Sequence, residues 1–289
     1  MSGHNERAPS ASNTRSDEQS IPAPNNGSGN QRYAQSQIGT SERAVSDLIG
    51  FILTFSVVMA SVILVSTVGF AQLEDFKAGQ QLDNAEQTFE IFATSFDSIE
   101  EGGALTRQES LDLYQGTIGI ERGSTATVTL NRSGGPNRAI SVPMNALVYS
   151  KDSTNISYES GATFRGREKG GTIKHKPGQV CTDDVVVLSF VTIQSPETST
   201  SGGGALEVTA TANGTDLLYP VNRSGSGSVS DVEYVSVSFT SARDDAWLDH
   251  FDRAENWTVS GSTAQCGSPS DPIEQAFVRR QNVTIEFGE

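Results

Sequence analysis

Hydrophobic and polar positions divide the chain into four successive regions. Residues 1–44 are mainly polar and cannot bury enough apolar surface to offset chain entropy, so they are predicted to be a disordered cytoplasmic leader. Residues 45–71 are almost entirely apolar. Residues 72–101 place apolar side chains at steps of three and four, whereas residues 102–289 contain short apolar runs between Gly, Ser, Asn and Pro. The pattern predicts, after the leader, a transmembrane helix, an amphipathic extension of that helix and an extracytoplasmic β-rich domain.

The apolar region is long enough to cross a membrane. Leu48 to Phe70 is 23 residues, or about 34 Å of helix, against a hydrocarbon core of roughly 30 Å. A cleaved secretory signal usually has an apolar region of only about 7 to 15 residues. A core helix of a soluble protein is the alternative, but such helices carry polar faces, and the polar side chains here are hydroxyls alone. We therefore predict a membrane anchor.

Flanking charges indicate the orientation of this anchor. Arg43 precedes it, while Glu74 and Asp75 follow it. Basic residues tend to remain cytoplasmic, so the N-terminus is predicted to be cytoplasmic and the C-terminal domain extracellular. The chain is then a single-pass protein of the cell membrane.

Beyond the anchor, apolar residues alternate steps of four and three and therefore share one helix face. This helix seam consists of Ala78, Leu82, Ala85, Phe89, Phe92, Phe96 and Ile99. One interpretation is that the seam packs against the chain's own β domain. The other is a coiled-coil contact with neighbouring subunits, for which about three heptads are available.

Short runs of β-forming residues follow from Thr117 onward. Alternation is clear in Val235, Val237 and Phe239, which indicates a strand with one solvated face. The seven predicted strands are 117–120, 126–130, 139–144, 185–193, 206–210, 232–239 and 281–287, and a short helix is predicted over 246–254. The fold class predicted is α+β: a long N-terminal helix followed by a mainly antiparallel β-sandwich.

The residues at the start of the anchor carry a family resemblance. The run Arg43-Ala44-Val45-Ser46-Asp47-Leu48-Ile49-Gly50 resembles the N-terminus of haloarchaeal type IV pilin-like proteins. The resemblance implies a pilin-like fold and a prepilin peptidase that cuts between Ala44 and Val45. It also implies, as a further partner, other pilin-like subunits bound through the N-terminal helix. Asp47 departs from the family pattern, which usually has Pro there.

Two downstream segments are similar to uncharacterised haloarchaeal membrane proteins with this N-terminus. They are 157–165, which reads SYESGATFR, and 241–248, which reads SARDDAWL. The resemblance implies no biochemical activity for either segment.

The charge balance agrees with a halophilic source. The formal net charge is −15, and arginine outnumbers lysine among the basic residues. An acidic surface remains hydrated where high salt screens other charges. Nucleic acid is not expected as a partner, because binding it requires a basic surface.

Six of the nine asparagines beyond the anchor begin an Asn-x-Ser/Thr triplet, which is more than chance would give. We expect glycosylation at some of them: Asn131, Asn155, Asn213, Asn222, Asn256 and Asn282. The two cysteines, Cys181 and Cys266, lie in the predicted extracellular part and are a disulfide candidate, with two separate thiols as the alternative.

No catalytic, cofactor or metal-binding constellation is evident. The sequence has neither two histidines at metal-ligand spacing nor a Gly-x-Ser-x-Gly motif. Three function classes follow. The first is a non-enzymatic pilin-like subunit of a surface filament or of the envelope, the second an unprocessed, anchored extracytoplasmic binding or envelope domain, and the third a surface enzyme that uses its paired aspartates.

Overall fold

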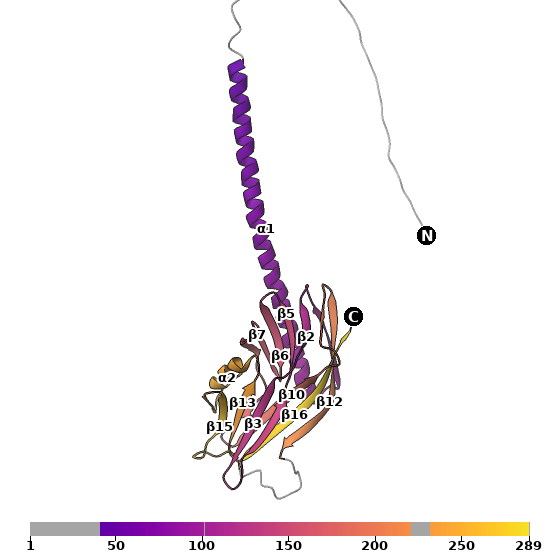
Figure 1. Ribbon diagram of the computed structural model, residues 1–289, viewed down its shortest axis with the longest axis vertical. Coiled ribbons are helices and arrows are strands. Elements are labelled where there is room, and N and C mark those ends of the chain that lie inside the picture. The colour runs from indigo at the N-terminus through magenta and orange to yellow at the C-terminus, as the bar shows by residue number, and fades with distance from the viewer. Residues whose placement is uncertain (1–40, 101, 221–231, 289) are drawn as a thin grey trace, which may run out of the picture. The chain divides into compact units, whose positions relative to one another are not determined.

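The computed structural model describes residues 41–100, 102–220 and 232–288. Helix α1 (Ser41–Glu100) precedes the β-strands, and a short helix, α2 (Asp244–Asp252), lies among the later ones. The chain divides into two compact units, Met1–Val65 and Ser66–Glu289. The α+β class is confirmed, since one long helix precedes a mostly antiparallel β-rich domain (Figure 1). Most of the predicted leader lies outside the described residues, and its last four residues belong to α1.

The described strands form three sheets. The first sheet runs in the order β1 (Thr106–Asp112), β12 (Ala205–Tyr219), β16 (Gln275–Gly288), β10 (Val185–Gln194) and β9 (Val180–Cys181). The second runs β11 (Ser199–Ser201), β2 (Thr117–Glu121), β5 (Ala146–Lys151), β6 (Thr154–Glu159), β7 (Ala162–Gly166) and β8 (Thr172–His175). The third runs β14 (Trp257–Ser260), β15 (Thr263–Gly267), β13 (Val232–Thr240), β3 (Thr125–Arg132) and β4 (Arg138–Pro143).

Strand pairing is antiparallel among these described strands, except between β10 and β16. Those two strands pair in parallel from Val185 opposite Gln275 to Gln194 opposite Thr284. Each of the seven predicted strands overlaps an observed one, and α2 overlaps the predicted short helix. The domain thus has three sheets, where a simple sandwich has two.

The first sheet contributes to two hydrophobic cores. Alternate residues of a strand point to opposite faces, and on β10 the side chains of Val186, Leu188 and Phe190 enter one core while Val191 and Ile193 enter the other. β16 is divided between the same two cores. The continuous apolar sequence of β10 follows from this burial on both faces.

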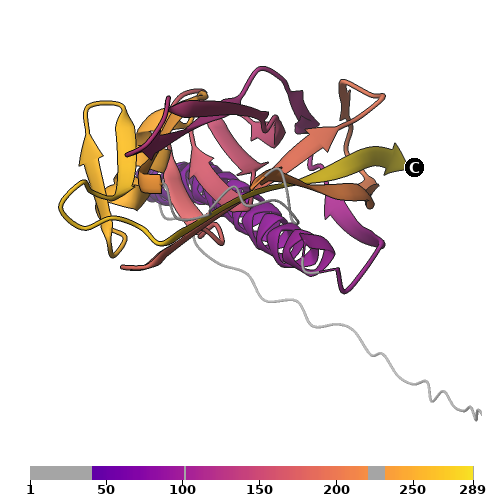
Figure 2. The same ribbon diagram turned by 90° about the horizontal axis from the view of Figure 1, so that it is seen from below.

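We call one core the α2 core, after helix α2, and the other the helix core, after helix α1. The α2 core includes Phe164, Leu188, Phe190, Val237, Phe239, Trp247 and Phe251. The helix core includes Phe89, Phe92 and Phe96 of α1 with Tyr149, Tyr158, Ile193 and Ile285 of the strands. Figure 2 shows α1 running alongside strands of the domain. Every residue of the two cores lies within the Ser66–Glu289 unit.

Aromatic contacts attach α2 to the α2 core. Trp247 is fully buried, stacks on Phe239 with ring centroids 4.8 Å apart, and meets Phe164 edge to face at 5.5 Å. Asp244 and Asp245 occupy the first turn of α2, and the N-cap position is Arg243, which makes no side-chain cap bond. The two carboxylates therefore stabilise α2 by lying at the positive end of the helix dipole.

A buried carboxylate joins the second and third sheets to α2. Glu159, at the end of β6, is fully buried. Its Oε2 accepts hydrogen bonds from Ser241 Oγ at 2.9 Å and Arg243 Nε at 2.9 Å, and its Oε1 accepts one from Trp247 Nε1 at 2.9 Å. Ser124 Oγ donates to the same carboxylate at 3.1 Å. The two segments that resemble other membrane proteins, 157–165 and 241–248, thus meet at one ion pair.

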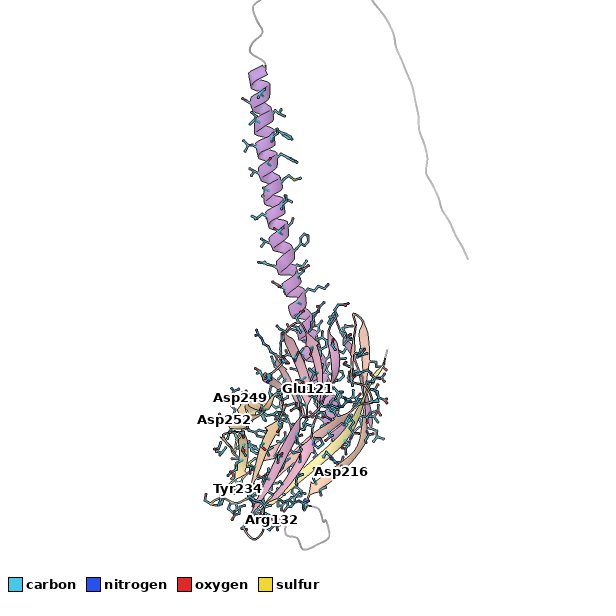
Figure 3. The ribbon with its side chains drawn as sticks, in the orientation of Figure 1. Glu121, Arg132, Asp216, Tyr234, Asp249 and Asp252 are labelled. Atoms are coloured by element: carbon cyan, nitrogen blue, oxygen red, sulfur yellow. A yellow bond between two sulfur atoms is a disulfide. The ribbon has the colours of Figure 1, made fainter. Side chains whose placement is uncertain are left out.

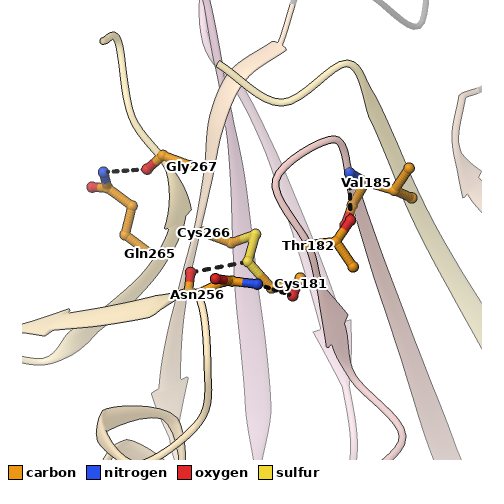
Figure 4. Close-up of a disulfide and its surroundings, with 7 residues drawn as sticks. All are labelled: Cys181, Thr182, Val185, Asn256, Gln265, Cys266 and Gly267. Atoms are coloured by element: carbon orange, nitrogen blue, oxygen red, sulfur yellow. Dashed lines mark hydrogen bonds between the residues drawn. A yellow bond between two sulfur atoms is a disulfide. The ribbon is translucent and has the colours of Figure 1, made fainter. Parts of the chain in front are cut away.

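A disulfide joins the first sheet to the third. Cys181 of β9 and Cys266 of β15 are bonded, with Cα atoms 6.0 Å apart (Figure 4). Beside the bond, Asn256 Nδ2 donates to the Cys181 carbonyl at 3.1 Å. The bridge closes a loop of 85 residues, which in the chain-entropy model stabilises the fold by roughly 4 to 5 kcal/mol.

We predict that Glu159→Gln destabilises the domain by about 3 kcal/mol, because Arg243 loses its fully buried ionic partner and keeps the more exposed Glu121, and because a neutral amide cannot accept all four hydrogen bonds that the carboxylate accepts. Urea denaturation of the full chain in detergent, followed by tryptophan fluorescence, measures this change. Glu168→Gln removes the same charge at an exposed position and is expected to change stability by less than about 0.5 kcal/mol. Equal stability of the two variants would contradict the role given to the buried carboxylate.

Candidate functional site

The first part of α1 presents apolar side chains to its surroundings on every face. Phe51 and Leu64 are each 67% exposed, and Val65 is 70% exposed. Figure 3 shows side chains projecting on all sides of this part of the helix. Thr54 Oγ1 donates to the Gly50 carbonyl at 2.9 Å, so a hydroxyl group is satisfied within the helix. Among the described residues this is the one helix long and apolar enough to cross a membrane, which suggests a single-pass membrane protein.

The proposed processing residues lie at the start of the same helix. Arg43, Ala44 and Val45 all have helical backbone. The side chains of Arg43 and Ala44 lie outside the described residues, and Val45 is 54% exposed. Arg43 and Ala44 therefore come immediately before the apolar segment, which begins at Val45.

The helix seam packs against the chain's own strands. Five of its members are buried, namely Ala85, Phe89, Phe92, Phe96 and Ile99, while Leu82 and Ala78 are partly buried. Phe96 stacks on Tyr158 of β6 with ring centroids 4.4 Å apart. Because the domain already covers this face, residues 85–99 do not offer the seam to a neighbouring subunit.

Beside the seam, ion pairs join α1 to β7 and β8. Arg165 Nη1 lies 2.8 Å from Asp83 Oδ1 and 2.6 Å from Glu86 Oε2. Lys174 Nζ lies 2.9 Å from Glu86 Oε1, and the ring of His175 contacts Asp97 Oδ2 at 3.1 Å. The sequence analysis missed these pairs. The available signal was that Asp83 and Glu86 are three apart and so share the helix face next to the seam.

The ion pairs shift the titration of their members. Burial alone would raise the pKa of Glu86, but hydrogen bonds and charge from Lys174 and Arg165 outweigh burial and lower that pKa below its ordinary value of 4.5. Hydrogen bonds to Asp83 and Glu86 raise the pKa of Arg165. Both groups are therefore charged at neutral pH, and the attachment of the helix to β7 and β8 is electrostatic there.

The six sequon asparagines lie in different environments. Asn213 and Asn256 are exposed, Asn155 and Asn282 are half-buried, Asn131 is 8% exposed, and Asn222 lies outside the described residues. Among those that the structure describes, Asn213 and Asn282 lie close together, because β12 and β16 pair from Ala212 opposite Val283 to Thr215 opposite Gln281. Asn282 Nδ2 donates to Asp216 Oδ2 at 3.0 Å on the ribbon formed by β12 and β16, where Figure 3 labels Asp216.

Asn131 is the sequon residue least suited to carry a glycan. Its Nδ2 donates to the Thr129 carbonyl at 3.3 Å and to Ser236 Oγ at 2.9 Å. Its Oδ1 accepts from Asn137 Nδ2 at 2.9 Å. A glycan there would break bonds in a buried polar cluster, whereas at Asn213 it would break an exposed hydrogen bond from Nδ2 to Thr284 Oγ1.

The short helix α2 carries both His250 and the aspartate pair Asp244–Asp245, which lie at opposite ends of it. His250 of α2 lines a hollow of 220 Å³ together with Lys176 and Arg253. Burial, and then the charge of Lys176, lower the pKa of His250, while Asp249 opposes the shift. Within the described residues no group of three or more His, Cys, Asp or Glu side chains is arranged to hold a metal ion. Asp249 also lines this hollow, which therefore presents groups of both charges.

Together, the apolar helix and the β domain define a class of protein, an α+β protein with one candidate membrane span ahead of a mainly antiparallel β domain. The chain belongs to a family of unknown function, DUF7289, whose model matches residues 43–286. No curated protein and no solved structure matches the chain.

We predict that Phe92→Asp unfolds or detaches the helix core, with a loss of about 3 kcal/mol or more, because it places a carboxylate where an aromatic ring is 3% exposed. Thermal and urea denaturation of the full chain in detergent measure the loss. Ile91→Asp is the matched control, since the neighbouring Ile91 is 51% exposed and should change stability little. Similar losses in both variants would show that the seam does not carry the packing.

The pairs of Glu86 give a pH dependence with a defined sign. Because the folded-state pKa of Glu86 lies below 4.5, its stabilising contribution is complete above that pH and disappears as pH falls through the lowered pKa. We therefore expect the stability difference between the native chain and Glu86→Gln to be constant near neutral pH and to vanish in acid. Urea titrations at a series of pH values test this, with Glu90→Gln on an exposed position as the control.

Proposed function

We propose that the protein is a non-enzymatic, pilin-like, membrane-anchored extracellular subunit, a component of a surface filament or of the envelope, that a prepilin peptidase processes between Ala44 and Val45. The observation that carries the proposal is helix α1. It combines a charge-free, exposed apolar segment with a seam that forms part of the interior of the following β domain.

The position of the processing residues supports the peptidase step. Arg43 and Ala44 precede the apolar segment, and the family match begins at Arg43. A cut after Ala44 would remove the polar leader and leave both the apolar segment and the seam in the mature chain. The anchor and the core of the domain would therefore survive processing.

The surface composition supports an extracellular, halophilic setting for the domain. The net charge is −15, and the structure holds a disulfide, which persists in oxidising compartments. Exposed sequons such as Asn213 are suitable acceptors for glycans on that side of the membrane. The charges around the anchor support a cytoplasmic N-terminus.

Mapping of the mature N-terminus tests the proposal. The full chain is isolated from membranes of the native host with and without its prepilin peptidase, and its mass and N-terminal peptide are determined. We expect a start at Val45 that is lost without the peptidase and is reduced in Arg43→Gln. Arg32→Gln removes a charge from the leader away from the junction and should be processed normally.

Two other outcomes would contradict the proposal. A start at or near Met1 in the wild-type host would identify an unprocessed, anchored extracytoplasmic domain. A start beyond Phe70 would identify a secreted domain that has lost both its anchor and its role as a subunit.

A further inference from the structure

A crevice lies between the second half of α1 and the β domain. It has a volume of 460 Å³, and α1 lines it with Glu74, Lys77 and Gln81. Tyr114, in the loop between β1 and β2, and Lys151, at the end of β5, line the side formed by the domain. All these residues belong to the Ser66–Glu289 unit, so the crevice is a feature of one compact body.

Positive charge is concentrated in this crevice beyond what the composition would give. The chain has five lysines and a net charge of −15, yet Lys77 and Lys151 both line the same hollow. The ammonium groups outnumber the one lining carboxylate, that of Glu74. A lysine ammonium carries three donors and acts as a point charge for phosphate.

The wall formed by the domain is held in a fixed shape. Lys151 Nζ donates to the Tyr114 carbonyl, and Tyr149 Oη donates to the Leu113 carbonyl at 2.8 Å. Gln115 N donates to the Gly202 carbonyl at 2.8 Å. These bonds hold Tyr114 and Gln115 at φ values of 48° and 68°, which residues other than glycine adopt only when the surroundings impose them. The crevice therefore exists before a ligand arrives.

The position of the crevice along α1 places it near the headgroup layer of a membrane that the helix spans. Lys77 lies seven residues after Phe70, or about 10 Å along the helix, and the headgroup layer is roughly 5 to 8 Å thick. Helix side chains tilt toward the N-terminus, and a lysine can extend its charge further along its stem. Leu73 and Phe76 are 60% and 66% exposed, so apolar surface continues almost to Lys77.

We propose that this crevice binds the phosphate headgroup of an anionic lipid in the leaflet from which α1 emerges into the domain. Lys77 and Lys151 contact the phosphate from opposite walls, and Glu74 limits the affinity. A bound lipid thereby fixes the domain at the membrane surface. The proposal requires α1 to span a membrane, but it depends neither on processing at Ala44 nor on assembly into a filament.

Native mass spectrometry of the full chain tests the proposal. The chain is reconstituted in nanodiscs with equal parts of phosphatidylglycerol and phosphatidylcholine, and the lipids retained on release are counted. We expect phosphatidylglycerol to be retained preferentially and its retention to fall about fivefold for each of Lys77→Gln and Lys151→Gln. Lys169→Gln, an exposed lysine outside the crevice, should leave retention unchanged. Glu74→Gln should raise it by a similar factor.

Three results would overturn the proposal. One is equal retention of the two lipids by the native chain, and another is unchanged retention in the double variant of Lys77 and Lys151 when its thermal unfolding is normal. The third concerns inorganic phosphate added to chain in neutral detergent: if it raises the unfolding temperature as much as phosphatidylglycerol does, the ligand is a soluble phosphate. N-terminal mapping is a separate measurement, so failure here leaves the processing proposal untouched.

Discussion

The structure depends on the burial of three phenylalanines of α1 inside the domain. Phe89, Phe92 and Phe96 are at most 3% exposed, and they fill a core whose other walls come from the first and second sheets. Burying such a ring contributes about 1.5 to 3 kcal/mol, which is a large fraction of the stability of a typical domain. This part of the helix is therefore an internal element of the domain, and removal of α1 up to Phe96 would take all three rings out of the core.

Polar contacts fix the positions of the two helices against the strands. Those at α2 are buried, and those at α1 lie nearer the surface. Glu159 is buried and satisfied by several donors, so misplacement of Arg243 or Trp247 removes a hydrogen-bond donor from a buried carboxylate. Arg165 and Lys174 act nearer the surface, where each pair contributes less and responds to salt. Hydrophobic contacts supply the attraction between elements, and these carboxylates select one arrangement among the many that would bury the same rings.

The local sequence pattern predicted those elements in which apolar residues recur at a regular spacing. The seam of α1 and the alternation of Val235, Val237 and Phe239 both follow from burial on one face, which leaves a trace in sequence. The β6 strand (Thr154–Glu159) left no such trace, because Ser157 and Glu159 are buried polar residues. Contacts between distant segments were also beyond prediction: Arg243 is 84 positions from Glu159. Likewise, no spacing in the sequence showed that Lys77 and Lys151 line one crevice.

The place of β16 in the first sheet constrains the order in which the molecule can form. This strand lies between β12 and β10, and its parallel partner begins 90 positions earlier, at Val185. Contacts of such long range close slowly, because loop entropy is lost before they form. During synthesis α1 is made before the strands, whereas both cores need side chains from Gln275–Gly288. The aromatic face of α1 therefore lacks its native partners until β16 has been made, and apolar surface exposed in this way is prone to aggregate.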